Sequence, residues 1–506
     1  MTAPGDKRKE AQGVPLPDKE MQAAIAVTRF GLGAKPGEIA EARGDPQGFL
    51  KGQIRREGAE LPSGQRATSA ERMGQFRDYR RERRELRVEK AADVRPLPPG
   101  APPSEANAAS MAQVRDPVKV IGNMLRQDVA SDFTARAQLA ATTDAAFRER
   151  WAMFWANHFT VSASKAITGT VIGPFEAEAI RPHVFGRFDE LLGAAESHPA
   201  MLTYLDQIQS IGPDSPAALF VRRGGRFGAG LQQAAANRAP GLNENLAREI
   251  MELHTVGVNG GYTQADVTEF ARAMTGMSIG GQRDAAFGVA VFREQAHEPG
   301  ERTVMGVRYD QPGRGQANAI LADLAAKPQT ARFICGKLAR HFVADDPPPA
   351  LVARLQAAWA GSSGDLATVA EALISAPEAW APRPGKFKTP YEFVVSSYRA
   401  AGGQPQGFQQ IGPILTALGQ KPFSAPSPKG WPQDAQSWAA PDAIVKRMQF
   451  AQAFSAAAVR GRDPKALAAE ALGERLTPET AKAIARAESR PEGFALLLMS
   501  PEFQRR

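Results

Sequence analysis

Residues 243–274 constrain the fold most, because they carry two apolar repeats of helical period with a glycine-rich break between them. When successive residues are placed at steps of about 100°, three apolar side chains of the first repeat share one face: Leu246, Ile250 and Leu253. Asn243 is a good N-cap for this helix, and Gly257 is a suitable residue to end it. We therefore expect a helix between these two residues, with its apolar face in the core.

The second repeat predicts a partner helix. Thr263 is an expected N-cap, and Asp266 stands three residues later, as in a capping box. The apolar stripe that follows consists of Val267, Phe270, Ala271 and Met274. Because only the short 257–261 turn separates the two helices, we expect them to pack as a helical hairpin.

The composition extends this interpretation to the whole chain. Hydrophobic residues make up 43% of the 506 residues, are weighted toward Ala and Leu, and include only 7% aromatic residues. Alternating runs of β-branched residues are scarce, so a mainly α fold with a large multi-helix core is expected. The best strand candidates are FGVAVFRE and RTVMGVRYD, within residues 287–312, which predict a minor β-hairpin.

Changes of composition suggest how the chain is divided. A charged helix, ERMGQFRDYRRERRELRVEK, and a Pro-rich linker form an insertion near residues 65–115. Residues 222–241 are rich in glycine and arginine, and we interpret them as a loop that could serve as a lid. The expected segments are a disordered start (1–18), N-terminal helices (19–61), the charged helix and linker (62–116), the main helical core (117–460) and C-terminal helices that pack on it (461–506).

Charge and cysteine content exclude several classes of protein. The net charge of +8 is modest for this length, and no nucleic-acid-binding motif is present. The single cysteine excludes an intramolecular disulfide and a cysteine-based metal site. No stretch reaches the roughly 18 apolar residues that a transmembrane helix needs. The N-terminus has no apolar core after its basic residues, so we expect a cytoplasmic protein, or an exported, periplasmic one if the true start lies elsewhere.

The first helix of the 243–274 stretch also carries a polar arc, formed by Asn245, Arg248, Glu249 and Glu252. Arg248 and Glu252 are spaced for an ion pair, and the two glutamates are close enough to raise each other's pKa if they are buried. His254 falls on the other side of the helix. If the arc faces water it is an ordinary charged face; if it faces a cleft it offers acid/base or metal-binding carboxylates beside an arginine.

Five further residues are candidates for chemistry or binding. His158 stands beside Asn157 and an aromatic wall, because Trp151, Phe154, Trp155 and Phe159 are spaced to share one helical face. Asp206 could orient a histidine or an arginine. His158 with Glu249, Glu252 or Asp206 would be a reasonable set of ligands for a divalent metal, but no spacing requires one, so the cofactor stays open. Arg29 would suit substrate oxygens, and Trp431 could stack on a sugar ring or a base.

Several segments together resemble the bacterial DUF1800 family of unknown function. They include RFGLGAKPGEI, WAMFWANHFTVS, the 243–276 stretch, KFKTPYEFVVSSYRA and the LGQKPF…KGWP region, and they run from about residue 22 to 455. The resemblance implies an all-helical core but no known reaction. It also implies export of many members and a DUF1501-type partner, because members are often encoded beside such proteins.

Two functional hypotheses follow. In the first, the protein is a hydrolase or transferase acting on a polar polymer or an anionic substrate. Glu249, Glu252, His158 and Asp206 would then be catalytic, and Arg29, Asn157, Asn245, Arg248 and Trp431 would bind substrate. In the second, the protein is a non-catalytic binding or assembly protein, which could be associated with the cell envelope, and the same polar groups form a structural network.

Overall fold

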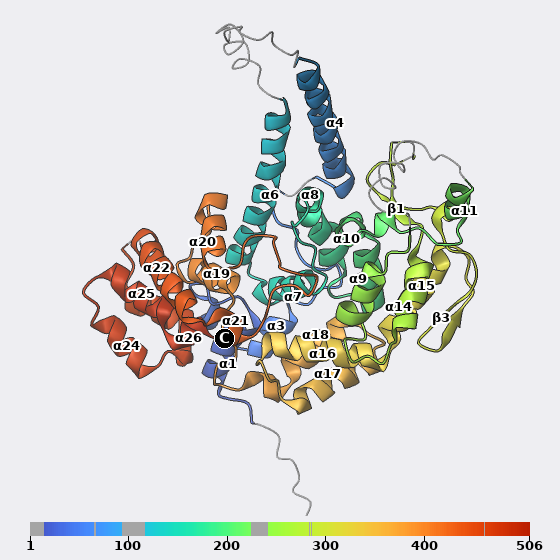
Figure 1. Ribbon diagram of the computed structural model, residues 1–506. Coiled ribbons are helices and arrows are strands. Elements are labelled where there is room, and N and C mark those ends of the chain that lie inside the picture. Colours follow the sequence, from blue (N-terminus) through green and yellow to red (C-terminus); the bar gives the residue numbers. More distant parts are fainter. Residues whose placement is uncertain are drawn as a thin grey trace, which may run out of the picture.

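A computed structural model describes residues 15–64, 67–93, 117–223, 241–282, 284, 286–459 and 461–506 (Figure 1). In these ranges the chain is mainly helical, and its strands form two small two-stranded sheets, so the expected mainly α fold is confirmed. Most of the expected disordered start, the Pro-rich linker and nearly all of the possible lid loop lie outside the described residues. None of the helices in the described ranges combines the length and the apolarity that a bilayer crossing needs.

The N-terminal helices pack at the base of the body. Asp18 caps the first of them by accepting a hydrogen bond from Met21 N (2.8 Å). This helix runs directly into a π-helical turn and contacts a turn near the C-terminus, where Arg475 donates to Thr28 Oγ1. The elements are α1 (Lys19–Ile25), the π-helical turn (Ala26–Phe30), α2 (Glu38–Ala42) and α3 (Pro46–Lys51).

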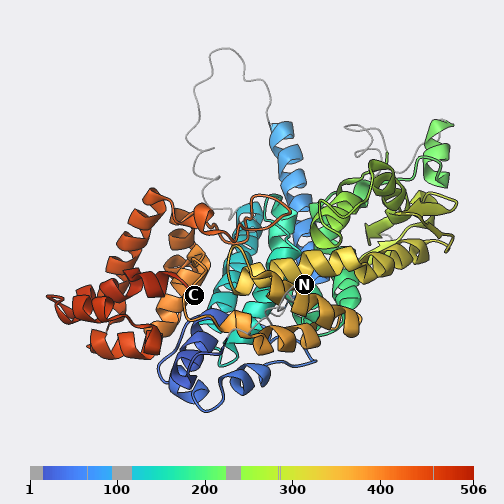
Figure 2. The same ribbon diagram turned by 90° about the horizontal axis from the view of Figure 1, so that it is seen from below.

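Two long helices, α4 (Ser69–Asp93) and α6 (Pro117–Thr142), lie side by side and stand out from the body (Figures 1 and 2). The arginine-rich segment therefore forms a helix, as expected. Near the body, Arg72 of α4 forms ion pairs with Asp128 and Asp132 of α6. Because these pairs join the two helices where they leave the body, the inner end of α6 is held in place beside α7.

The centre of the body is built around α7 (Ala146–His158), whose aromatic face is fully buried, as its spacing predicted. Trp151 stacks on Phe185 at 5.9 Å, and its Nε1 donates to Val184 O at 2.7 Å. The other helices of the body are α8 (Ala166–Phe175), α9 (Phe188–Ser197), α10 (Pro199–Tyr204), α15 (Arg314–Ala326), α16 (Pro328–Phe342), α17 (Pro349–Gly361), α18 (Leu366–Ser375) and α19 (Pro390–Ala400). A short helix, α11 (Pro216–Arg222), lies at the periphery.

The 243–257 segment departs from the expected single helix. A short α-helix, α13 (Asn245–Glu249), continues as a π-helical turn (Ile250–His254), and Glu244 rather than Asn243 occupies the N-cap position. The wider turn shifts the residues that follow it around the axis. As a result His254 is fully buried, whereas Leu253, which was expected in the core, is only half-buried.

The second helix of this stretch follows its prediction closely. Helix α14 (Gln264–Met274) begins with the capping box of Thr263 and Asp266, and its apolar stripe is buried. Helices α13 and α14 pack against each other, which confirms the helical hairpin.

The strands pair differently from the simplest expectation. FGVAVFRE does not pair with RTVMGVRYD: β2 (Ala290–Phe292) pairs with β1 (Met277–Ile279), whereas β3 (Arg302–Val304) folds back on β4 (Val307–Tyr309), both antiparallel. Met305 and Gly306 have φ values of 49° and 79°, and two such residues in a row make the tight turn of a hairpin. RTVMGVRYD is therefore a complete minor hairpin by itself.

The last helices form a group on one side of the body, opposite the strands (Figures 1 and 2). They are α22 (Pro441–Ala458), α23 (Pro464–Leu472), α24 (Pro478–Ala485), α25 (Arg490–Met499) and α26 (Pro501–Gln504). The chain reaches them through α20 (Gly412–Ala417), α21 (Ala435–Trp438) and the irregular segment between these two helices. This segment, residues 418–434, is called the 418–434 loop below; it crosses the end of α7.

Candidate functional site

A pocket with a cavity volume of about 110 Å³ lies where the 418–434 loop crosses α6, α7, α8 and α19. Much of its wall is aromatic. Phe133 meets the rings of Tyr391 and Phe423 edge-on, with centroids 5.8 and 5.2 Å apart. The aromatic residues that line the pocket are Phe133, Phe175, Tyr391, Phe423 and Trp431.

An ion pair forms one polar part of the wall. Arg136 of α6 and Glu176, directly after α8, lie 2.9 Å apart, and both side chains are largely buried. The guanidinium of Arg136 also lies 5.3 Å from the ring centre of Tyr391, a cation–π distance. The positive charge is therefore balanced by Glu176 and spread over an aromatic face.

The hydroxyl of Tyr391 has no hydrogen-bond partner among the described residues, although the side chain is only 5% exposed. Burial raises the pKa of Tyr391 above its usual range, so the phenol is neutral and can both donate and accept. A buried hydroxyl without a partner costs about 1–3 kcal/mol. Since Tyr391 lines the pocket, this unpaired group marks a place where a ligand could supply the missing hydrogen bond.

His341 supplies a second unpaired atom to the same pocket. Its Nδ1 lies 3.3 Å from Gln433 Oε1, and its Nε2 has no partner in the described part of the chain. Burial, followed by the charges of Arg150 and Arg506, holds the pKa of His341 well below its usual value. Because Gln433 Oε1 can only accept, we place the hydrogen of the neutral ring on Nδ1, which leaves Nε2 as an acceptor.

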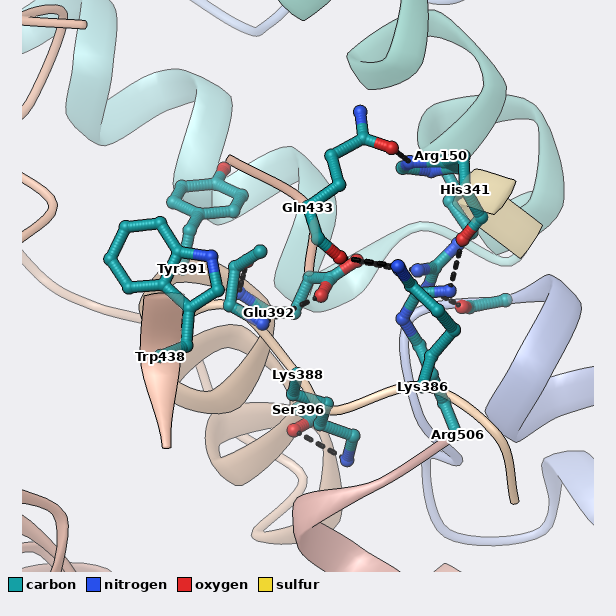
Figure 3. Close-up of polar contacts among 12 residues, drawn as sticks. Arg150, His341, Lys386, Lys388, Tyr391, Glu392, Ser396, Gln433, Trp438 and Arg506 are labelled. Carbon is teal, nitrogen blue, oxygen red and sulfur yellow. Dashed lines mark hydrogen bonds and ion pairs between the residues drawn. The ribbon is translucent and has the colours of Figure 1, made fainter. Parts of the chain in front are cut away.

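Beside these groups, Glu392 is held by two guanidiniums, those of Arg150 (2.5 Å) and Arg506 (2.9 Å) (Figure 3). Burial alone would raise the pKa of Glu392, but Arg506 and Arg150 outweigh it and keep this pKa far below its usual range. Lys386 contacts Asp345 and Gln433 O close by, and Lys388 donates to Ser396 Oγ at 3.0 Å. Glu392 is thus a permanent carboxylate and cannot serve as a general acid near neutral pH.

The 418–434 loop is fixed to the end of α7 by Asn157. The Oδ1 of Asn157 accepts from Trp431 N at 2.8 Å, and its Nδ2 donates to Trp431 O at 3.2 Å. Both residues were expected to bind substrate, and both line the pocket. Trp438 supports the loop through Nε1, which donates to Pro432 O at 2.8 Å, and its ring centre lies 6.1 Å from that of Trp431.

His158, although next to Asn157, does not line the pocket. It is buried, with Nδ1 2.8 Å from Lys337 Nζ and Nε2 3.2 Å from His254 O. His254 in turn lies 2.7 Å from Glu196, and both of these side chains are fully buried. His158 therefore belongs to a buried polar network with His254 and Glu196. The sequence placed His254 on the side of its helix away from Glu249 and Glu252, and its carboxylate partner comes from another helix, α9.

The polar arc, which spans α13 and the π-helical turn after it, lies outside the pocket and is mostly half-buried. The sequence predicted an ion pair between Arg248 and Glu252. In the structure Arg248 pairs instead with Glu244 (2.9 Å), which stands one turn earlier on the same face. Burial, with a contribution from Glu252, raises the pKa of Glu249, in the expected direction. Asn245 is exposed. In the described ranges no cluster of three or more His, Cys, Asp or Glu side chains is arranged to hold a metal ion.

The last two expected site residues lie elsewhere. Asp206 has a left-handed backbone (φ 58°) and forms an ion pair with Lys165 at 2.7 Å. Arg29 is buried and donates to two backbone carbonyls, Ala379 O at 2.7 Å and Arg383 O at 2.8 Å. Of the nine residues expected at a site, the pocket therefore brings together only Asn157 and Trp431.

The sequence pointed to the segment of Tyr391 but not to its role. KFKTPYEFVVSSYRA contains a capping box, in which Thr389 is the N-cap and Glu392 accepts from its backbone N–H, and the whole helix that follows is buried. A tyrosine inside such a helix start is a signal that its hydroxyl needs a partner. Which residues lie opposite it depends on the tertiary structure.

Comparison with known families agrees with these motifs. The family model described as protein of unknown function (DUF1800) matches residues 25–505, nearly the whole chain. No curated protein and no solved structure matches the chain. The chain therefore belongs to the DUF1800 family.

Proposed function

We propose that the pocket binds a sugar ring, as a segment of a polar polymer, and that the protein acts as a binding protein for that ligand. The observation that carries this proposal is the combination of aromatic walls with two buried neutral atoms, Tyr391 Oη and His341 Nε2, that have no hydrogen-bond partner among the described residues. Aromatic side chains pack well on the apolar faces of a sugar ring, and a few neutral donors and acceptors fit its hydroxyl groups.

The charges around the pocket support recognition by stacking and hydrogen bonds. Arg136 and Glu176 balance each other, and Glu392 is already paired with two guanidiniums. Arg150 and Arg506 together carry one positive charge more than Glu392 neutralises, so the pocket would also tolerate an acidic sugar. Tyr391 Oη and His341 Nε2 are both covered by other atoms, so a ligand can reach them only if a lining side chain moves. Gln433 is the candidate, because its side-chain amide is held by one long contact, 3.3 Å between Oε1 and His341 Nδ1.

A hydrolase or transferase acting on the same polymer is the second candidate. It is favoured by Glu176, a carboxylate that lines the pocket beside an arginine, with a histidine in the same wall. Cleavage of a glycosidic bond usually needs two carboxyl groups, one of which donates a proton. Glu392 cannot donate one, since Arg150 and Arg506 keep it ionised. This is why we favour binding without cleavage.

Calorimetry of the full chain with a panel of soluble neutral, N-acetylated and acidic oligosaccharides tests the proposal. We expect at least one to bind, and Tyr391→Phe to weaken that binding about tenfold, which corresponds to about 1.4 kcal/mol. Trp431→Ala should also weaken it. Tyr204→Phe, at a half-buried tyrosine outside the pocket, serves as the control.

Binding by none of the oligosaccharides, or equal binding by the Tyr391→Phe variant, would reject the sugar pocket. The same titrations followed by product analysis separate the two candidates. Release of shorter fragments that stops in a Glu176→Gln variant would support the hydrolase, whereas intact ligand supports binding alone.

For a partner, we propose a DUF1501-type protein, on the basis of the family resemblance. Co-expression of the chain with a DUF1501-type protein of the same host, followed by affinity purification, tests this pairing. Fractionation of the native host would decide between a cytoplasmic and a periplasmic location, the two alternatives raised by the N-terminal sequence.

A further inference from the structure

Lys337 stands out among the described lysines because its amine contacts a histidine and no carboxylate. It lies on α16, one turn before His341, and is partly exposed. Its Nζ is 2.8 Å from His158 Nδ1 and 5.3 Å from the ring centre of Phe333. The amine is therefore held in a fixed position at the edge of the buried His158 network.

The hydrogen bonds of His158 determine which atom donates to which. His158 Nε2 lies 3.2 Å from the backbone oxygen of His254, which can only accept, so Nε2 carries the ring hydrogen. Burial, followed by the charge of Lys337, holds the pKa of His158 well below its usual value, so the ring is neutral. Nδ1 is thus a bare acceptor, and Lys337 Nζ donates to it.

The charges that face Lys337 disfavour its ammonium form. Arg340 of the same helix and Lys429 of the 418–434 loop are cations, and His158 of α7 is neutral. Behind His158, His254 and Glu196 are paired with each other. In the described part of the chain no carboxylate lies within ion-pair distance of Lys337 Nζ. Burial, Lys429 and Arg340 together lower the pKa of Lys337 to about 7.

We propose that Lys337 is a nucleophilic amine that captures a small anionic carbonyl compound, such as a 2-oxo acid, as an imine. The Nζ lone pair attacks the carbonyl carbon, and the π electrons of the C=O bond move to oxygen. The resulting carbinolamine forms a C=N bond and loses its oxygen as water, which takes both amine hydrogens. His158 is a positioning residue, and the exposed cations Arg340 and Lys429 would attract the carboxylate.

Reductive trapping on the full chain tests this site. Glyoxylate with cyanoborohydride would be added over a range of pH, and the modified lysines identified by peptide mass spectrometry. At about pH 7 we expect Lys337 to be labelled at least tenfold faster than exposed Lys446 and Lys465, because an ordinary lysine, with a pKa of about 10.4, is then almost fully protonated. Acetaldehyde, which has no carboxylate, should show a smaller preference for Lys337.

A matched pair of variants tests the electrostatic cause. Lys429→Ala removes a neighbouring cation from an exposed loop position, so the pH at which Lys337 reaches half of its maximal labelling rate should rise. Lys465→Ala removes an exposed cation elsewhere and should leave that pH unchanged. The inference is overturned if Lys337 reacts no faster than Lys446 at neutral pH, or if the two rates rise in parallel up to high pH. It does not depend on sugar binding, so either proposal can fail alone.

Discussion

The side-chain amide of Asn157 makes two hydrogen bonds to the backbone of Trp431: Oδ1 accepts from the N–H, and Nδ2 donates to the carbonyl oxygen. This pair joins the end of α7 to a loop that follows far later in the sequence, and it sets one wall of the pocket. The contact leaves little room at the neighbouring Gly430, where an added Cβ would lie 2.4 Å from Asn157 O.

Gly430→Ala should therefore destabilise the protein more than backbone strain alone explains. Gly430 and Gly37 have the same φ of 85°, but a Cβ at Gly37 would meet no atom within 4 Å. Gly37→Ala thus measures the strain of a left-handed alanine, about 1 kcal/mol. We expect urea unfolding to show a clearly larger loss for Gly430→Ala. Equal losses would mean that the loop relaxes away from Asn157 without cost.

The hydroxyl of Tyr391 should contribute nothing favourable to stability, because it has no hydrogen-bond partner in the part of the chain that the structure describes. Tyr391→Phe is expected to leave the free energy of unfolding unchanged or slightly higher. Tyr309, by contrast, donates to Asp323 Oδ2 at 2.7 Å, so Tyr309→Phe should lose about 0.5–1.5 kcal/mol. Thermal or urea unfolding of both variants measures the difference. A clear loss in Tyr391→Phe would show that its hydroxyl has a partner in solution.

The contact between Glu196 and His254 should be costly to break. Both side chains are fully buried and 2.7 Å apart, and changing one partner of a buried polar contact typically costs about 1–3 kcal/mol, or more where a charged group is involved. Glu196→Gln should therefore lower the melting temperature strongly. Asp442→Asn breaks an exposed i,i+4 pair with Lys446 and should have no measurable effect. Near-normal stability of Glu196→Gln would contradict this prediction.

Two buried neutral histidines predict a loss of stability in mild acid. Burial is the main cause that lowers the pKa of His158 and His341. In the unfolded chain both rings take up a proton below about pH 6.5, which the folded state resists. Stability is then constant above that pH and falls below it, by up to about 1.36 kcal/mol per pH unit for each histidine.

His341→Gln should make the decline between about pH 6.5 and 5 shallower than in the wild type. Urea unfolding at several pH values measures the slope, with Asn245→Ala, at an exposed position, as the control. An unchanged slope in the His341→Gln variant would contradict a neutral His341.

Local patterns in the sequence determined much of the helical architecture. Apolar stripes at i, i+3 and i+4, together with capping residues, depend only on near neighbours along the chain. For this reason α14, its Thr263–Asp266 capping box and the buried aromatic face of α7 follow directly from the sequence. The same local signals located RTVMGVRYD as strand, although not its closure on itself.

Only the tertiary structure decided the site. The π-helical turn at Ile250–His254 places His254 against Glu196, and periodicity cannot foresee an extra residue in a turn. The pocket brings Phe133, Glu176 and Tyr391 together from distant segments, and their meeting depends on how the helices pack. A helix pattern fixes which side of a helix is apolar. Which polar side chains remain unpaired is decided only once every neighbouring helix is in place.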